Sequence, residues 1–397
     1  MYVYVTGAIT QLMSTVDDQS YIRDSGIMEG VSLGENATNT SALYTYTNAS
    51  NMTQDHVFHP QLRMNPDAGS FASVIELYVK PVLVITGALG NCLILLTVRQ
   101  KNMAHWSVCL YLAAYAVGNF LILVPMMGAE WLCNITGTKY VNTLTNWTCK
   151  LWQFIMGVTI YSGIWFMFAM LVDQFILIWM PHKAQAMCTV FMAKFAIVII
   201  MIGLTVISVH AIWTYELFDN GCFILHTPND LLTTIWPWVT LCLHCVLPLL
   251  LIFVFICLVM YGVFTKSNWK KSSSNYQVPT DITIMIIVLS IVYVILVTPA
   301  TVINVLTQNL PLSWLHDEEF YTNLITIVAV VGDLLTYLNP ALAFFVCVTF
   351  SSTFRGELRE QIRALCCDNV SRVYEMQLNA GHGSGIEQET CSETTPL

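Results

Sequence analysis

Seven long apolar stretches constrain this chain more than any other feature of its sequence. A helix needs about 20 mostly apolar residues to cross a bilayer, because its backbone N–H and C=O groups must bond to each other where water is absent. With 56% hydrophobic and only 10% charged residues, the chain is predicted to be an all-α membrane protein, a seven-transmembrane helix bundle. The predicted spans are Leu77–Val98, Ser107–Met127, Leu151–Met180, Val190–Trp213, Leu232–Phe264, Thr280–Leu306 and Phe320–Val348.

The distribution of charge predicts which side of the membrane each segment occupies. With the amino terminus outside, eleven of the 16 Lys and Arg residues fall on the inner side and five on the outer side, as the positive-inside rule requires. Six Asn-X-Ser/Thr sequons also fall outside in this orientation, and we expect glycosylation there. They are Asn36, Asn39, Asn48, Asn51, Asn134 and Asn146.

The composition divides the chain into four parts. Residues 1–72 are rich in Asn, Thr and Ser without periodic apolar residues, which favours a flexible glycosylated extracellular segment over a small folded ectodomain. Residues 73–350 form the bundle. Residues 351–367 are predicted to be a short amphipathic eighth helix, with apolar residues on one side and arginines for the headgroups. Residues 368–397 are predicted to be a disordered cytoplasmic tail.

Two features near the carboxyl end suggest attachment to other components. Cys366 and Cys367 follow the amphipathic segment and suit S-palmitoylation, although a plain reduced pair fits equally well. Thr395 and Leu397 stand where a PDZ domain reads a carboxyl-terminal strand, a pattern short enough to arise by chance.

Three cysteines lie in predicted outer segments, which face an oxidising compartment. They are Cys133, Cys149 and Cys222. One disulfide is expected among them, with one thiol left over, and spacing does not choose the pair.

Polar residues inside the spans each require a reason, because an ionised group at the bilayer centre costs about 2.5–3.5 kcal/mol. Asp173 and Gln174 interrupt the third span, and Asp333 interrupts the seventh with no cation nearby in its own helix. We expect Asp333 to face a polar interior, to bind a ligand or to be protonated. Together with Glu130 and acidic loop residues, it predicts an acidic outer mouth that attracts a cationic ligand.

Several motifs resemble those of a rhodopsin-like G-protein-coupled receptor, over roughly Leu77 to Cys367. "GALGNCLILLTV" is similar to the family's first helix and places Gly90 and Asn91 on its Gly-Asn pair; "KLWQFIMG" resembles the start of the third helix. The prolines of the fifth, sixth and seventh helices find their counterparts in Pro248, Pro299 and the pair Asn339-Pro340. The resemblance implies a Cys149–Cys222 disulfide. "YLAAYAVGN" and "LVTPATVINVL" are similar to invertebrate neuropeptide receptors.

The switch motifs of that family are altered here. Asn119 stands where the family usually has Asp, and Asp173-Gln174-Phe175 replaces the Asp-Arg-Tyr triplet. Val297 and Ala343 replace the usual Trp and Tyr of the sixth and seventh helices. Without the arginine, Asp281 at the inner end of the sixth span has no cation from the third helix, so we expect a weaker resting-state latch and doubtful G-protein coupling.

The resemblance implies a plasma-membrane receptor whose extracellular ligand is a small peptide, basic and amidated, with a heterotrimeric G protein as the inner partner. The expected pocket residues, carried over by position, are Glu130, Gln153, Asn304, Gln308 and Asp333. A non-signalling decoy or heteromer partner of the same fold is the alternative; a transporter or channel fits less well, because the chain has no repeats and few intramembrane charges. The sequence indicates no enzyme, cofactor, metal site or nucleic-acid partner. An opsin is excluded because Phe320–Val348 contains no lysine.

Overall fold

The structure, a computed structural model, describes residues 74–218, 221–224, 242, 246–265, 278–309 and 318–364. Within these ranges it leaves out the side chains of residues 76, 223, 224, 301–329 and 333. Several predictions concern residues outside the described part of the chain: Asn36, Asn39, Asn48, Asn51, Cys366, Cys367, Thr395 and Leu397.

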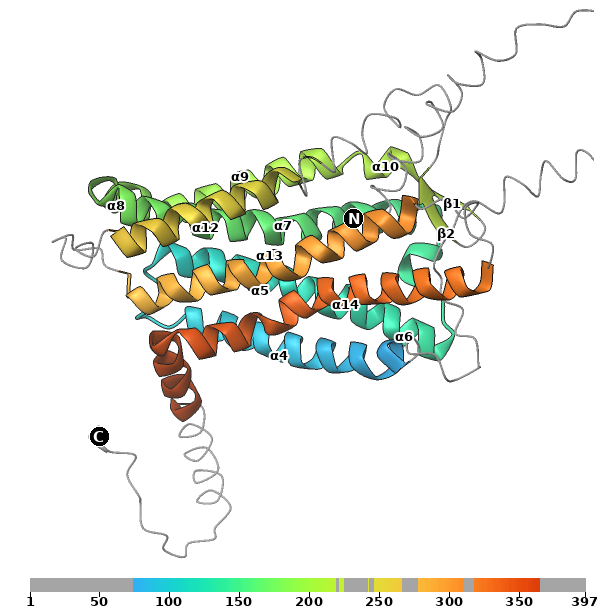
Figure 1. Ribbon diagram of the computed structural model, residues 1–397, viewed down its shortest axis with the longest axis horizontal. Helices are drawn as coiled ribbons and strands as arrows, with labels where there is room; N and C mark the ends of the chain where they lie inside the picture. The colour runs from blue at the N-terminus through green and yellow to red at the C-terminus, as the bar shows by residue number, and fades with distance from the viewer. Residues whose placement is uncertain are drawn as a thin grey trace, which may run out of the picture.

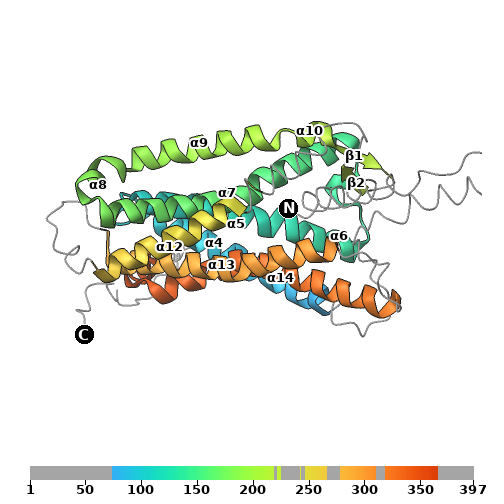
Figure 2. The ribbon, with the colours of Figure 1, turned by 45° about the horizontal axis from the view of Figure 1, so that its top comes forward.

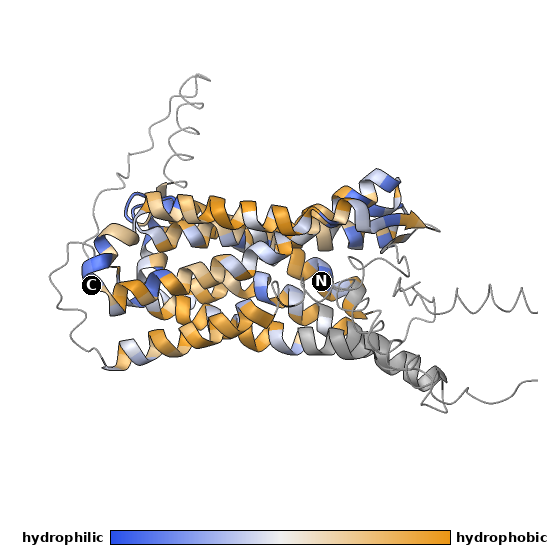
Figure 3. Ribbon diagram, turned by 90° about the horizontal axis from the view of Figure 1, so that it is seen from above, coloured by the Kyte–Doolittle hydropathy of each residue, from blue (hydrophilic) through white to orange (hydrophobic). Residues whose placement is uncertain are grey.

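Seven described helices are long and apolar enough to cross a membrane, and they run alongside one another as a bundle (Figures 1 and 2). Apolar residues cover most of their length, and hydrophilic residues gather toward the ends (Figure 3). The helices are α4 (Lys80–Val98), α5 (Ser107–Leu121), α7 (Asn146–Trp179), α9 (Val190–Ser208), α12 (Leu247–Thr265), α13 (Thr280–Asn309) and α14 (Glu318–Phe350).

Shorter elements mark the two ends of the bundle. We call the end that carries β1 (Tyr215–Phe218) and β2 (Gly221–Ile224) the outer end, following the predicted orientation; these strands pair antiparallel. A helix over residues 352–364 follows α14 at the opposite, inner end. The remaining elements are η1 (Ile75–Val79), η2 (Ile122–Gly128), α6 (Ala129–Thr136), η3 (Val141–Thr143), α8 (Pro181–Met187) and α10 (Ala211–Thr214).

Several spans differ in length from their predicted limits. The third span begins at Asn146 rather than Leu151, because Thr145 and Thr148 form a reciprocal cap. The Thr145 hydroxyl accepts from the Thr148 N–H at 3.2 Å, and the Thr145 N–H donates to the Thr148 hydroxyl at 2.9 Å. Of the predicted fifth span Leu232–Phe264, the structure describes Cys242 and the part from Val246 onward.

The second span continues beyond Met127 to Thr136 through η2, a π-helical segment that contains Pro125. Proline has no N–H, and wide turns of this kind leave backbone carbonyls without their regular partners. The Tyr140 hydroxyl, from the loop after α6, donates to the carbonyls of Pro125 and Met126 at 3.3 and 3.1 Å. The outer loop therefore supplies a hydrogen bond to the irregular part of the span.

The core lies in the inner half of the bundle, where α5, α7 and α13 meet. Tyr115, Met167, Leu171 and Met285 are completely buried in one apolar cluster there. This burial positions the polar groups of α5, α7 and α13 next to one another, away from lipid.

A glycine sets how closely α4 approaches α14. A Cβ added at Gly90 would lie 2.7 Å from the Cβ of Phe344, so only glycine fits without a shift of the helices. Gly203 on α9 has no neighbouring atom within 4 Å of the same added Cβ.

We predict that Gly90→Ala lowers the thermal stability of the purified protein, because overpacking costs about 1–3 kcal/mol. Gly203→Ala is the matched control: it makes the same chemical change in a helix and should leave the melting temperature unchanged or slightly raised. Equal melting temperatures for the two variants in detergent would contradict the close contact between α4 and α14.

Candidate functional site

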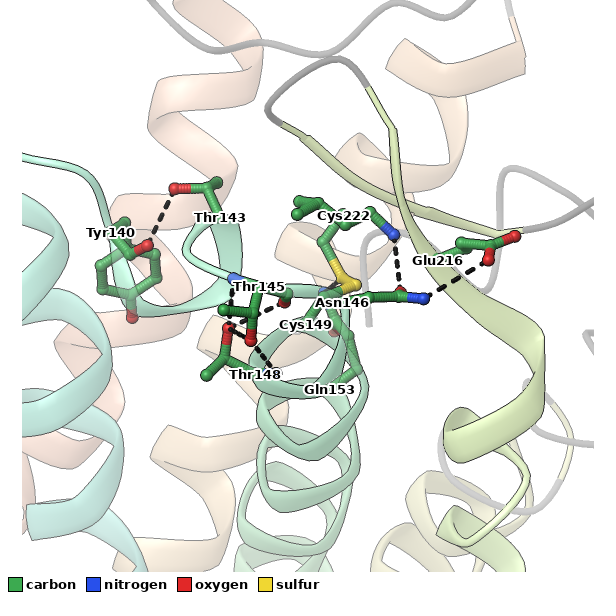
Figure 4. Close-up of a disulfide and its surroundings, with 10 residues drawn as sticks. Tyr140, Thr143, Thr145, Asn146, Thr148, Cys149, Gln153, Glu216 and Cys222 are labelled. Atoms are coloured by element: carbon green, nitrogen blue, oxygen red, sulfur yellow. Dashed lines mark hydrogen bonds between the residues drawn. A yellow bond between two sulfur atoms is a disulfide. The ribbon is translucent and has the colours of Figure 1, made fainter.

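The outer end of α7 is joined to the β1–β2 hairpin by a disulfide between Cys149 and Cys222. This confirms the pairing that the family resemblance implied. Cys133 is the third outer cysteine, and its thiol is free. Figure 4 shows the disulfide beside the capping residues of α7, so the hairpin is attached at the point where this helix begins.

Asn146 makes a second connection between α7 and the hairpin. Its amide donates to the Glu216 carboxylate at 3.4 Å, and its oxygen accepts from the Leu217 N–H at 3.1 Å (Figure 4). The nitrogen that a glycan would occupy is thus already bonded in the folded protein. Glycosylation at Asn146 and at Asn134, an exposed residue of α6, stays a prediction.

The structure describes the side chains of two of the five predicted pocket residues. Gln153, one turn below Cys149, points its amide at the Cys222 sulfur at 3.8 Å. Glu130 lies on α6 and is partly buried. Asn304 and Gln308 lie on α13 and Asp333 lies on α14, but their side chains are outside the described part, so the gathering of all five stays a prediction.

Tyr140 packs against the outer end of α7. Its ring packs edge-on against Trp152, with centroids 5.3 Å apart. Burial raises the pKa of the Tyr140 hydroxyl well above its usual range, and the nearby charge of Glu130 raises it further. The hydroxyl therefore stays protonated and keeps its role as a hydrogen-bond donor to η2.

In the middle of the bundle, uncharged side chains join three helices. The Asn91 amide donates to the carbonyls of Gly87 at 2.8 Å and of Pro340 at 2.9 Å. Asn119 donates to the Asn91 oxygen at 3.2 Å. Asn91, Asn119 and Pro340 thus link α4, α5 and α14. The part of α14 that contains Pro340 is held by an amide rather than by an ion.

Asn339, next to Pro340, extends this network to α5. Its amide donates to the Tyr115 hydroxyl at 3.0 Å, while its own oxygen is buried without a partner among the described residues. The predicted switch residues Asn91, Asn119, Asn339 and Pro340 thus lie together, and Pro299 lies within α13.

Asp173 and Gln174 are both buried, and they connect α7 to two different helices. One oxygen of Asp173 accepts from the Ser107 hydroxyl at 2.7 Å, at the start of α5. The Gln174 oxygen accepts from the Thr283 hydroxyl at 2.7 Å, near the start of α13. Gln174 therefore links the third and sixth spans through a contact between neutral groups, while Asp173 links the third span to the second.

Phe175, the third residue of the altered triplet, belongs to an aromatic contact that the sequence reading missed. Its ring packs against Phe255 of α12 with centroids 5.3 Å apart and stacks on Trp179. The Trp179 indole donates to the Leu258 carbonyl at 3.0 Å. Aromatic residues at helical spacing in both segments could have indicated this contact. Apolar spans contain many such residues, however, so the pattern does not single out these partners.

Asp281 is also engaged, although α7 offers it no cation. Its carboxylate accepts hydrogen bonds from residues 351–353, which join α14 to the following helix. The expectation concerned only a cation from the third helix, and the described partners of Asp281 are instead hydroxyl and N–H groups beyond the end of α14; the weaker resting-state latch stays a prediction. No local pattern around Asp281 indicates a partner seventy residues away in the chain.

We predict that Ser107→Ala destabilises the protein by about 1–3 kcal/mol, because it removes the donor to a buried carboxylate. Thr86→Ala is the control, since the exposed Thr86 hydroxyl bonds only to the Val82 carbonyl of its own helix in the described contacts. The measurement is thermal unfolding in detergent; a loss no larger than that of the control would show that the bond to Asp173 contributes little.

A search of curated proteins found no match. A family model described as "7 transmembrane receptor (rhodopsin family)" matches residues 90–342, more than half of the chain. The matched region holds the Gly-Asn pair, the disulfide and the Asn-Pro pair described above. The chain therefore belongs to the rhodopsin family of seven-transmembrane receptors, which are non-enzymatic receptors of the plasma membrane.

Proposed function

We propose that this receptor has its amino terminus outside and binds a small, basic, amidated peptide at its outer end. The supporting observation is the charge of the outer segments after residue 73. They contain three cationic residues, Lys80, Lys139 and Lys150, and nine acidic ones: Glu76, Glu130, Glu216, Asp219, Asp230, Asp317, Glu318, Glu319 and Asp333. Such an excess raises the local concentration of a cationic ligand and its rate of association.

The pocket we propose lies between α6, α7, α13 and α14. Gln153 points toward the hairpin, which is fixed by the disulfide and by Asn146. A fixed hairpin supports binding, because a preorganised site loses less entropy when the ligand enters. Asp333 is the residue we assign to the cationic group of the peptide, with Glu130, Asn304 and Gln308 as further polar contacts.

On the inner side, members of this family act through heterotrimeric G proteins, and we propose that coupling here is altered. Gln174 is completely buried and bonded to Thr283, and no cation takes its place among the described residues of α7. This observation favours a second candidate function, a non-signalling decoy or heteromer partner with the same outer pocket.

We further propose that Thr395 and Leu397 bind a PDZ domain and that Cys366 and Cys367 carry palmitate.

We predict that Asp333→Asn weakens binding of cationic peptides at least tenfold, because removing one partner of a desolvated charge pair costs about 2–5 kcal/mol. Glu357→Gln serves as the control, since it makes the matching change at the inner end, where Glu357 bonds to Asn102, and should leave affinity unchanged. Direct binding of labelled amidated peptides to surface-expressed protein is the measurement; unchanged affinity for every cationic ligand found would remove Asp333 from the pocket.

A second prediction separates the signalling receptor from the decoy. The double variant Gln174→Arg with Ala343→Tyr should gain ligand-dependent nucleotide exchange on G proteins if the protein is a dormant switch. Binding affinity should stay the same, because both positions lie far from the outer end. Robust exchange by the unmodified protein would eliminate the decoy, and no gain by the variant would favour it.

A further inference from the structure

The carboxylate of Asp281, in the first turn of α13, accepts four hydrogen bonds from three consecutive residues. One oxygen accepts from the Ser351 hydroxyl at 2.8 Å, the Ser352 hydroxyl at 3.1 Å and the Thr353 N–H at 2.8 Å. The other oxygen accepts from the Thr353 hydroxyl at 3.1 Å. Both oxygens are thus engaged with the start of the helix over residues 352–364.

These bonds complete the amino-terminal cap of that helix. The first N–H groups of a helix have no partner within it, and a negative charge beside them is favourable. Ser351 supplies the local half of the cap, because its hydroxyl accepts from the Phe354 N–H at 3.0 Å. Asp281 supplies the other half from a different helix, so the cap is complete only while α13 stays in place.

The helix over residues 352–364 is held independently of Asp281. The Arg355 guanidinium donates to the carbonyls of Val348 and Thr349 at 2.7 and 2.9 Å, at the end of α14. Asn102, in the loop after α4, donates to Glu357 at 2.9 Å. Phe354 is completely buried, and its ring packs against Phe344. The helix is therefore a fixed point to which α13 is attached.

The other described polar contact at this end of α13 is the neutral bond between Thr283 and Gln174. Hydrogen bonds in which one partner is ionised are roughly twice as strong as neutral ones. Of the two contacts, the one to Asp281 therefore contributes more to holding the inner end of α13.

We propose that Asp281 and residues 351–353 form a charge-assisted latch that holds the inner end of α13 against the helix over residues 352–364. The latch holds the inner end of α13 in place of an ionic contact with α7, because α7 supplies no cation to Asp281. Opening of α13 breaks the four bonds together and leaves the amino terminus of the helix with half of its cap.

The test measures the position of α13 directly, so it does not depend on the proposed ligand or on coupling. Spin labels are placed at Ile284→Cys on α13, which is 42% exposed, and at His105→Cys before α5, in a background whose other reactive cysteines are replaced. Asp281→Asn keeps the size of the side chain and removes the charge. We expect the ratio of the population with a long label-to-label distance (open) to the population with a short one (closed) to rise about tenfold. This is the change expected for one lost charge-assisted hydrogen bond.

Glu357→Gln is the matched control, because it removes a charge from the same helix at its contact with Asn102 and should leave the distances unchanged. Thr353→Val removes one of the four bonds with little disturbance to folding, and should shift the ratio in the same direction by a smaller factor. Parent-like distances in both Asp281→Asn and Thr353→Val, or an equal shift in Glu357→Gln, would overturn the latch.

Discussion

A polar group inside this bundle is stabilised by a partner within the protein, because the surrounding hydrocarbon offers none. This requirement explains why the side chains of the buried amides and carboxylates bond to neighbouring helices. Asn91 bonds to the Pro340 carbonyl, and Asp173 bonds to Ser107. The same contacts that satisfy these groups also fix which helices are neighbours, so polar satisfaction and helix arrangement are one property of the fold.

The number of spans and the disulfide could be predicted from the sequence, and for different reasons. Apolar length alone identifies a spanning helix, whereas Cys149 and Cys222 were chosen among three cysteines only through the resemblance to a family. Helix limits were less accurate. The third span starts earlier because of the Thr145–Thr148 cap, and the second continues past Pro125 as a wide turn, which is a local geometry that hydropathy does not encode.

The partners of the polar residues could not be predicted, because they depend on how distant segments pack. Gln174 was recognised as a changed switch residue, yet nothing in the chain indicated Thr283 as its partner. Asp281 was expected to have no cation from the third helix, and nothing in the chain indicated that it would instead complete the cap of another helix. Sequence patterns report the face on which a residue lies, and the choice among partners across that face requires the fold.

The bond between Gln174 and Thr283 also determines how the inner end responds to its surroundings. Neither side chain gains or loses a proton in the physiological range, and a bond between neutral groups is not weakened by dissolved salt. This bond therefore joins α7 to α13 without itself depending on pH or on salt concentration.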